Sequence, residues 1–455
     1  MGPWPLTRYR YQGVNMSVNT AFDVDATVQK LVLTDNIKEK EALAREIQSQ
    51  AQTKGIYLAS IHDVYMARGK GQGKNFTVPA MNLRSLTYYL ARAIFRTAKR
   101  LNAGAFIFEI AKSEMGYTGQ PPIEYVGVIL GAAFKEGYSG PVFIQGDHCQ
   151  IKASEYFKDK NKEVSGLKDM VADCVAAGFY NIDVDSSTTV KLDRPTLTEQ
   201  QRDNFEVCAD MSAFISKIQP KGIEVSIGGE IGEVGHKNST VDELVAFMDG
   251  YNKSLPEGFD GLSKISVQTG TSHGGVVLPD GSMANVTVDF NTLKALSEAA
   301  QKKYGMGGEV QHGASTLPDN AFNKFPEVNT VEIHLATNFQ NKTLDSKLFP
   351  KDLYNKMIEW TKVNCISERK STDTDEQYIY KARKRALGQF KKEIMNMPLN
   401  VKEGIAAEIE KNFEFLFKQL NVNDTKEFVT SIVKPVQATI GLRHTQAHLD
   451  GEGDD

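Results

Sequence analysis

Two neighbouring stretches decide the fold of this chain: Val310-Gln-His312-Gly313-Ala-Ser315-Thr316-Leu-Pro318, and Thr330-Val-Glu-Ile-His334-Leu-Ala-Thr337-Asn338-Phe-Gln340. The first predicts a short buried strand ending in His-Gly, then a turn of small residues and a helix. The second predicts another strand that ends in a polar cluster. Together they place a metal ligand and a phosphate-binding turn just beyond a strand, so the question is whether other strands complete such a site.

Apolar runs rich in β-forming residues alternate with helical patterns from Phe76 onward. The intervening segments, such as 85–101 and 291–304, have helical periodicity and are long enough to be crossovers. Short buried strands that alternate with helices indicate parallel βαβ units. Eight such units predict an α/β fold, a closed (β/α)8 TIM barrel, with an open doubly wound sheet as the alternative. The eight runs are residues 76–81, 105–110, 141–144, 179–184, 222–227, 262–267, 309–311 and 331–335.

The chain on either side of these runs has helical patterns instead. We expect an N-terminal arm with helices over residues 1–75, the barrel over 76–345 and a C-terminal helical extension over 346–455. Within the arm, residues 20–66 are expected to be helical throughout. The last residues, 450–455, are acidic and are expected to form a disordered tail.

Composition excludes several classes of protein. The 455 residues are 41% hydrophobic and carry a net charge of −4, so there is no basic excess to neutralise nucleic acid. No apolar run approaches the roughly 20 residues that span a bilayer, which predicts no membrane association. The four cysteines are scattered without CxxC spacing, which favours reduced thiols in a cytoplasmic protein.

Polar side chains gather where the predicted strands end. In a barrel, functional side chains come from the carboxyl ends of the strands. Five of the eight histidines lie at or just past such ends, together with several carboxylates. Imidazoles and carboxylates at one barrel mouth predict a divalent metal site, with zinc favoured by the nitrogen-rich set and cobalt, iron or manganese left open. The residues concerned are Asp147, His148, Asp183, Asp185, Glu230, His236, His273, His312 and His334.

Three of these histidines, His148, His273 and His312, stand at equivalent strand ends. A catalytic zinc ion usually has three protein ligands and one open position, which fits this set. Taken alone, each of these histidines would more often be a structural residue with its hydrogen bonds satisfied than a metal ligand. Asp147 precedes His148, and because the chain turns at a strand end, both side chains can reach the mouth. The alternative role for Asp147 is to orient a ligand or to cap the next helix.

Small residues beyond the last strands predict a phosphate site. His273-Gly274-Gly275 and His312-Gly313-Ala-Ser315 expose backbone N–H groups with little obstruction, and the hydroxyls of Ser315 and Thr337 add donors. Loops after the seventh and eighth barrel strands commonly bind phosphate together with a helix N-terminus. The alternative is ordinary helix capping by Ser315 or Thr316 ahead of Pro318.

These motifs resemble the class II, metal-dependent aldolases that cleave ketose bisphosphates, among them fructose-bisphosphate and tagatose-bisphosphate aldolases. The resemblance covers about residues 77–340. It is strongest at Gly146-Asp147-His148, Gly229-Glu230-Ile231-Gly232, Gly270-Thr-Ser-His273-Gly274, His312-Gly313-Ala314-Ser315 and His334-Leu335-Ala336-Thr337. Several short motifs in the family's order, on matching strands, make the signal specific.

The resemblance assigns roles position by position. Asp147 corresponds to the catalytic aspartate that exchanges the proton of the substrate's C4 hydroxyl. His148, His273 and His312 correspond to the zinc ligands, Glu230 to a glutamate in an alternative coordination position, and Asp183 to a nearby acidic residue. The resemblance also implies a possible monovalent cation near the phosphate loops. The segments that would hold the dihydroxyacetone phosphate portion are Gly274, Gly313, Ala314, Ser315, His334, Leu335, Ala336 and Thr337.

The implied reaction is the reversible cleavage of a ketose bisphosphate, with fructose 1,6-bisphosphate as the first candidate. The metal would polarise the C2 carbonyl, and Asp147 would deprotonate the C4 hydroxyl so that the C3–C4 bond breaks. The products would be dihydroxyacetone phosphate and an aldehyde phosphate. The resemblance also implies a homodimer or a higher homo-oligomer.

Two departures from the family pattern set limits on this interpretation. The loop after the fifth strand lacks the family's glutamate and has Gly235-His236-Lys237-Asn238-Ser239 instead, and His334 replaces an asparagine that touches the substrate. Arg383 of the C-terminal region is a candidate for the group that reaches a second phosphate. The alternative function is a non-catalytic, aldolase-like barrel subunit that binds a sugar phosphate and stabilises a partner aldolase.

Overall fold

Eight parallel strands pair into a closed ring in the computed structural model, which describes residues 22–231, 237–270, 278 and 287–443. The order around the ring is β4-β3-β2-β9-β8-β7-β6-β5, and the pairing of β5 with β4 closes it. The predicted α/β class and (β/α)8 TIM barrel are therefore confirmed. The strands are β2 (Val78–Asn82), β3 (Ile107–Ala111), β4 (Gly140–Gln150), β5 (Asn181–Asp185), β6 (Ser226–Glu230), β7 (Lys264–Val267), β8 (Glu309–Gln311) and β9 (Glu332–Leu335).

A further strand, β1 (Ile56–Ala59), lies where the sequence predicts helix. It pairs in parallel with the first residues of β4, from Gly140 to Phe143. The chain then turns beneath the ring, where the backbone N–H of Ile61 donates to Oδ1 of Asn181 at 2.9 Å. The prediction of continuous helix over residues 20–66 is wrong here, because a short apolar run fits a buried strand as well as a helix.

Helices surround the ring and extend beyond it at both ends of the chain, as the sequence predicts. The N-terminal helices α1 and α2 pack against α6, where Lys40 of α2 forms an ion pair of 2.6 Å with Glu124. The helices up to the end of the barrel are α1 (Val24–Leu33), α2 (Ile37–Gln52), α3 (His62–Gly69), α4 (Thr87–Arg100), α5 (Lys112–Thr118), α6 (Pro122–Lys135), α7 (Ala153–Lys158), α8 (Lys160–Ala177), α9 (Leu197–Ile218), α10 (Val241–Ser254), α11 (Phe290–Tyr304), α12 (Lys324–Glu327) and α13 (Thr337–Leu344).

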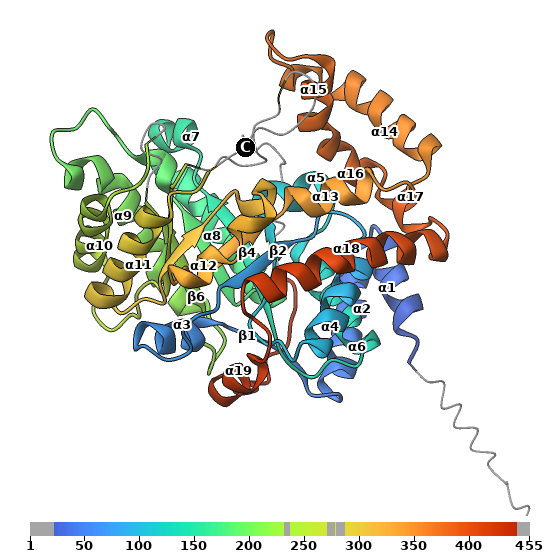
Figure 1. Cartoon of the computed structure of the whole chain (residues 1–455), viewed down its shortest axis with the longest axis horizontal. Coiled ribbons are helices and arrows are strands. Elements are labelled where there is room, and N and C mark those ends of the chain that lie inside the picture. The colour runs from blue at the N-terminus through green and yellow to red at the C-terminus, as the bar shows by residue number, and fades with distance from the viewer. Residues whose placement is uncertain (1–21, 232–236, 271–277, 279–286, 444–455) are drawn as a thin grey trace, which may run out of the picture.

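The C-terminal extension forms a layer of helices beside the barrel mouth. Figure 1 shows α14 and α15 in orange above α5 and α13, and α16 packs against α5. The longer helix α18 returns along α4, where Arg96 forms an ion pair of 2.6 Å with Glu410. The extension thus reaches two sides of the barrel. Its helices are α14 (Lys351–Asn364), α15 (Asp375–Ala382), α16 (Ala386–Gln389), α17 (Lys391–Met395), α18 (Leu399–Gln419) and α19 (Lys426–Ile432).

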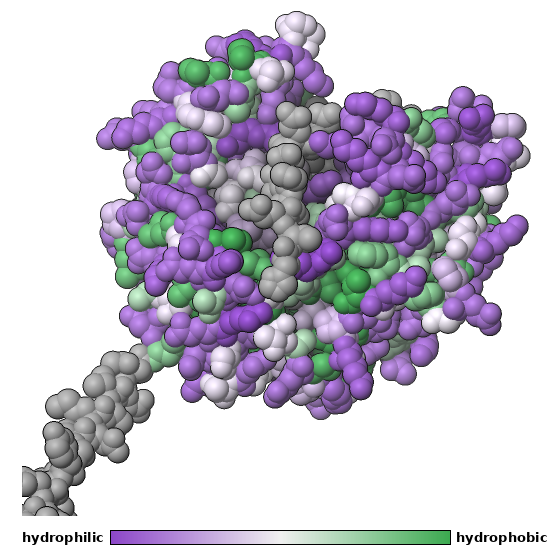
Figure 2. Space-filling model, turned by 180° about the vertical axis from the view of Figure 1, so that it is seen from behind, coloured by the Kyte–Doolittle hydropathy of each residue, from purple (hydrophilic) through white to green (hydrophobic). Residues whose placement is uncertain are grey.

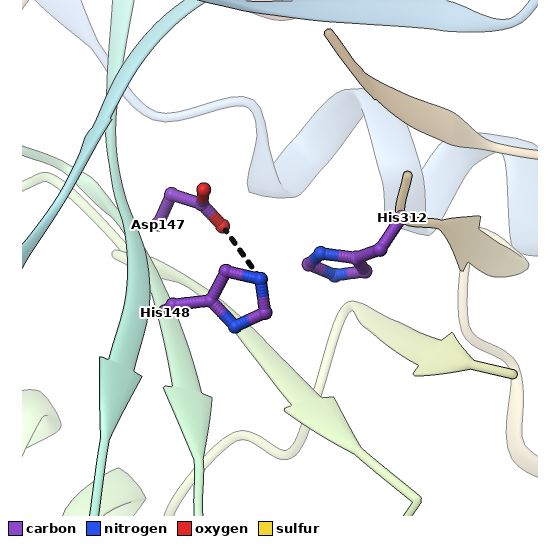
Figure 3. Close-up of side chains that lie close together, drawn as sticks. All are labelled: Asp147, His148 and His312. Carbon is purple, nitrogen blue, oxygen red and sulfur yellow. Dashed lines mark ion pairs between the residues drawn. The ribbon is translucent and has the colours of Figure 1, made fainter. Parts of the chain in front are cut away.

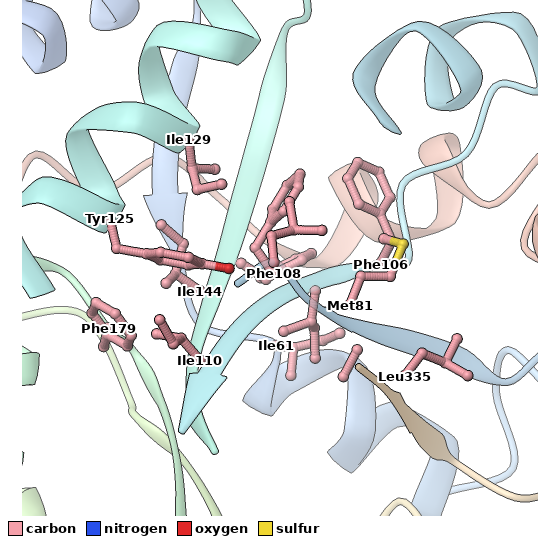
Figure 4. Packing of buried hydrophobic residues seen from close by; sticks show 14 of the residues in the cluster. Ile61, Met81, Phe106, Phe108, Ile110, Tyr125, Ile129, Ile144, Phe179 and Leu335 are labelled. Carbon is pink, nitrogen blue, oxygen red and sulfur yellow. The ribbon is translucent and has the colours of Figure 1, made fainter. Parts of the chain in front are cut away.

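The hydrophobic core lies between the outer face of the strands and the helices. Figure 4 shows Tyr125 and Ile129 of α6 over Ile144 of β4 and Ile110 of β3. The Tyr125 hydroxyl donates a hydrogen bond of 2.7 Å to the carbonyl of Glu109, so this layer also fixes β3. Its side chains are fully buried and apolar, which explains why the strands appear in the sequence as hydrophobic runs.

Hydrophilic residues cover most of the molecular face in Figure 2, and hydrophobic residues appear there as small separate patches. Among the described residues, no helix combines the length and the apolar composition that crossing a membrane requires.

Candidate active site

A bulge at the end of β4 brings two neighbouring side chains to the barrel mouth. The pairing of β4 with β5 changes register between Gly146 and Cys149, and His148 has a φ of +39°. In a regular strand Asp147 and His148 would point to opposite faces. With the bulge, Nε2 of His148 lies 3.9 Å from Oδ1 of Asp147, and both residues line one cavity.

His312 meets this pair from the other side of the barrel, as Figure 3 shows. It follows β8 directly, and its ring centroid lies 4.5 Å from that of His148. Nε2 of His312 lies 2.8 Å from the hydroxyl of Ser266 on β7, which fixes the ring. Donor atoms of Asp147, His148 and His312 all lie within 4.8 Å of one another. This set of two imidazoles and a carboxylate fits a divalent transition metal such as zinc.

Two carboxylates hold the other nitrogen of His148. Nδ1 lies 3.1 Å from Asp185, at the end of β5, and 3.9 Å from Glu230, at the end of β6. Burial lowers the pKa of His148, but the charges of Asp147, Glu230 and Asp185 outweigh burial and hold its pKa well above the ordinary value. Metal-binding histidines typically have such a carboxylate on the second nitrogen. Asp185 and Glu230 therefore orient His148.

Asp185 belongs to the predicted polar cluster, but the family resemblance assigns a role only to Asp183. Asp183 lies two residues before Asp185 on β5 and therefore deeper in the barrel. There it forms an ion pair of 2.8 Å with the fully buried Lys264. It is still within 4.8 Å of donor atoms of Asp147 and His334. Both aspartates alternate along β5 and face the barrel interior. Position along the strand distinguishes the two aspartates, because the residue nearest the carboxyl end of the strand reaches the barrel mouth.

His334 lies in the barrel interior, directly behind Asp147. Its Nδ1 is 3.1 Å from Oδ1 of Asp147 and its Nε2 is 2.7 Å from Oε1 of Glu332. Its ring centroid is 4.1 Å from that of His312. The departure from the family's asparagine thus places a larger side chain against the candidate catalytic carboxylate.

The expected phosphate segments converge at one side of the cavity. Gly313 has a φ of +68°, a conformation that favours glycine, and a 3-10 turn over Ala314–Thr316 follows it. The Ser315 hydroxyl accepts a hydrogen bond of 2.6 Å from the backbone N–H of Ala336, which joins the two segments. Thr337 begins α13. The single helix expected after Ser315 is instead two 3-10 turns and the short α12.

A cavity of about 410 Å³ is bounded by these groups and by the C-terminal extension. Of the expected substrate-binding positions, Gly313, Ser315, His334, Ala336 and Thr337 line it. The side chains of Ala314 and Leu335 pack in the hydrophobic core instead.

The extension contributes a wall with four cations and one carboxylate among the described residues: Lys370, Lys381, Lys384, Arg385 and Glu368. Nε of Arg385 lies 2.7 Å from Glu368, and Lys381 forms an ion pair of 2.7 Å with Asp373. Arg383 does not line the cavity. It is 5% exposed and bonds to Asn341 and Asp345 of the segment after β9 at 2.9 and 3.0 Å. It anchors the extension, and its neighbours Lys384 and Arg385 face the cavity instead.

Four predicted features lie outside the described residues. They are the third histidine His273, the neighbouring Gly274, the loop residues Gly235 and His236, and the acidic tail over residues 450–455.

Comparisons with known proteins found solved structures that are similar to this chain and a matching family model. Solved structures similar to this chain include a Sinorhizobium meliloti 1021 protein described as a probable tagatose 6 phosphate kinase, at 13% identity and a TM-score of 0.52, over 78% of this chain and 98% of that one. Others are the fructose-bisphosphate aldolase of Campylobacter jejuni (16% identity, TM-score 0.44, 81% and 97% covered) and the YdjI aldolase of Escherichia coli K12 (15%, 0.41, 74% and 97%). At these identities the likeness concerns the fold.

No curated protein sequence matches this chain. A family model described as fructose-bisphosphate aldolase class-II matches residues 68–403, which is most of the sequence and contains every candidate site residue. The chain belongs to the class II fructose-bisphosphate aldolase family.

Proposed function

We propose that this protein is a metal-dependent aldolase, a lyase that reversibly cleaves a ketose bisphosphate, with fructose 1,6-bisphosphate as the first candidate substrate. The observation that carries the proposal is the meeting of Asp147, His148 and His312 at one barrel mouth, with donor atoms within 4.8 Å of one another. The products would be dihydroxyacetone phosphate and an aldehyde phosphate.

His148 and His312 would hold the metal, together with His273, and Glu230 lies close enough to His148 to offer an alternative ligand. Asp183 would serve as a further acidic group from below. A bound divalent ion supplies Lewis-acid polarisation of a substrate carbonyl. We expect zinc, and we leave a monovalent cation near the phosphate segments as a prediction.

Asp147 would take the proton from the C4 hydroxyl and return it in the reverse direction. Burial raises the pKa of Asp147, but the charges of His148 and His334 outweigh burial and hold its pKa well below the ordinary range. The carboxylate form is the one that can accept a proton. His334 keeps the carboxylate in place from behind.

The two ends of the cavity suit two phosphate groups. Backbone N–H groups of the segment from Gly313 to Ser315, and of the start of α13 at Thr337, would hold the dihydroxyacetone phosphate end. The cations of the extension, Lys384 and Arg385 among them, would hold the other phosphate. This charge pattern favours a bisphosphate over a monophosphate.

The test is an assay of the purified protein with fructose and tagatose bisphosphates, after its metal content has been measured. We expect bound zinc or a related metal, cleavage that a chelator abolishes, and recovery on adding zinc. Asp147→Asn should keep the metal and lower kcat by about 10²- to 10⁴-fold. Sugar-phosphate binding without cleavage, even after metal addition, would favour the alternative of a non-catalytic subunit that stabilises a partner aldolase.

Two further expectations concern the protein in the cell. All four cysteines are buried and unpaired, which suits a reducing compartment, and we propose a cytoplasmic location. A homodimer or higher homo-oligomer is a prediction from the family, and a sedimentation experiment measures it directly.

A further inference from the structure

His334 is enclosed by charged groups from four strands of the barrel, including Asp183 on β5, whose Oδ2 lies 3.6 Å from Nε2. Nδ1 lies 3.1 Å from Oδ1 of Asp147 on β4 and 3.2 Å from Oε2 of Glu109 on β3. Nε2 lies 2.7 Å from Oε1 of Glu332 on β9. Since both ring nitrogens face carboxylate oxygens, both are placed as hydrogen-bond donors, and the ring cannot rotate without losing one of its partners.

The far end of this chain of contacts is fixed in turn. Nζ of Lys264 lies 2.6 Å from Oε1 of Glu332, and the hydroxyl of Tyr65 hydrogen-bonds the other oxygen. Lys264 and Glu332 are fully buried, and Glu332 does not line the cavity. Four side chains therefore lie in series, from Lys264 through Glu332 and His334 to Asp147. Only the last two reach the cavity where substrate would bind.

We propose that His334 is a positioning residue that holds the Asp147 carboxylate in its reactive orientation and is itself held by Glu332. The inference rests on the proposed function, since Asp147 is the group that would exchange the substrate proton. The bulge at residues 146–149 leaves Asp147 without a register partner on β5, while its backbone still pairs with Ala111 of β3, so the orientation of its side chain depends on side-chain contacts. The contact from His334 is a charge-assisted hydrogen bond, which is the strong kind.

Two other roles for His334 lead to different results on mutation. If it contacted substrate directly, its loss would raise KM, and Glu332 would matter little because Glu332 does not line the cavity. If it served only the fold, its loss would lower thermal stability and leave kcat of the folded protein unchanged. Positioning predicts a lower kcat with KM and metal content preserved, for both His334 and Glu332.

The experiment compares His334→Ala, His334→Asn and Glu332→Gln in the full-length, zinc-loaded protein. We expect His334→Ala to lower kcat by roughly 10- to 100-fold, the cost of a misplaced catalytic group, with little change in KM. His334→Asn should recover part of this loss, because the asparagine amide can occupy the place of Nδ1 as a donor. Glu332→Gln should lower kcat by a smaller factor in the same direction.

The matched control is His62→Gln, which replaces another buried histidine, on α3 and outside the cavity. It should leave kcat unchanged. Circular dichroism and metal analysis confirm that each variant is folded and loaded. A crystal structure of His334→Asn or His334→Ala gives a readout independent of activity: Asp147 should leave its wild-type rotamer or lose order.

Wild-type kcat in His334→Ala, an effect confined to KM, or an unaffected Glu332→Gln would each overturn the positioning role while leaving the aldolase assignment intact. A wild-type protein that cleaves no ketose phosphate when loaded with metal would overturn both.

Discussion

The inner and outer faces of the barrel strands are equally buried but chemically opposite. On the outer face, Phe108, Ile144, Ile182, Ile265 and Ile333 are all fully buried against helices. Their immediate neighbours in sequence point inward and are Glu109, Gln145, Asp183, Lys264 and Glu332, none more than 5% exposed. Branched apolar side chains usually fill the interior of such a barrel. Here a polar network occupies that space, beneath the candidate active site.

The two faces are held together by different forces. Apolar burial stabilises the outer face in proportion to area, whereas charges inside must be paired to offset their loss of hydration. Lys264 is paired with Asp183, Glu332 and Gln145, which come from three other strands. Gly228 makes this possible, because a Cβ there would lie 2.4 Å from Oδ1 of Asp183 and 2.9 Å from Cε of Lys264. An interior of paired charges can hold Asp147 and His334 at fixed positions. An interior of apolar side chains could not.

Breaking the interior pairing should have the largest effect on stability. Lys264→Met leaves the carboxylates of Asp183 and Glu332 buried without their cation, so the free energy of unfolding should fall by about 3–5 kcal/mol. Urea denaturation measures it. The control is Lys303→Met, which breaks an exposed ion pair with Asp249 and should cost less than about 1 kcal/mol. Equal losses in the two variants would show that the interior is not held by its charges.

Glu309 is a buried, poorly paired carboxyl on the outer face of β8, where it is in register with Ile265 of β7. Thr330 donates to one oxygen at 2.6 Å, the other oxygen has no hydrogen-bond partner among the described residues, and burial raises the pKa of Glu309 from 4.5 to about 8. The folded state therefore binds this proton more tightly than the unfolded state, and stability falls as pH rises between these two values. Glu309→Gln should remove that slope, about 1.4 kcal/mol per pH unit.

Denaturation at pH 5.5 and pH 7.5 checks this prediction. The advantage of the variant over the wild type in free energy of unfolding should grow by about 2.5 kcal/mol between these two pH values. Glu298→Gln, an exposed change on α11, is the control and should leave the slope as it is. An unchanged slope in Glu309→Gln would mean that Glu309 is ionised in the folded protein.

The outer face was predictable from sequence and the inner face was not. Hydrophobic runs located all eight ring strands, because the residues on the outer face of each strand give the sequence its apolar run. Polar residues that alternate with apolar ones predict a half-exposed strand just as well as an inward-facing one. Only the closed ring brings Lys264 and Glu332 together. The sequence likewise does not show that Asp185 lies nearer the mouth than Asp183, or that Lys384 lines the cavity where Arg383 does not, since side-chain depth depends on packing.

A substitution in the cavity wall tests whether the C-terminal extension contributes to substrate binding. Lys384→Ala should raise KM for fructose 1,6-bisphosphate about tenfold, or about 1.4 kcal/mol, through loss of a charge-assisted contact with the second phosphate. Cleavage of a 1-monophosphate should be unaffected. Lys356→Ala, an exposed change on α14 outside the cavity, is the control. Equal changes of KM for both substrates would mean that Lys384 does not contact the second phosphate.

The smallest effect should come from the outer face itself. Ile144→Val removes one methylene from a fully buried side chain and should lower the free energy of unfolding by about 0.5–1.5 kcal/mol. Its neighbour Gln145 points the other way, into the network around Lys264. Because Ile144 contacts helices rather than the mouth, kcat should stay at the wild-type value in a steady-state assay. A fall in kcat comparable with that of His334→Ala would mean that the helical layer also positions Asp147, and the two faces would no longer be separable.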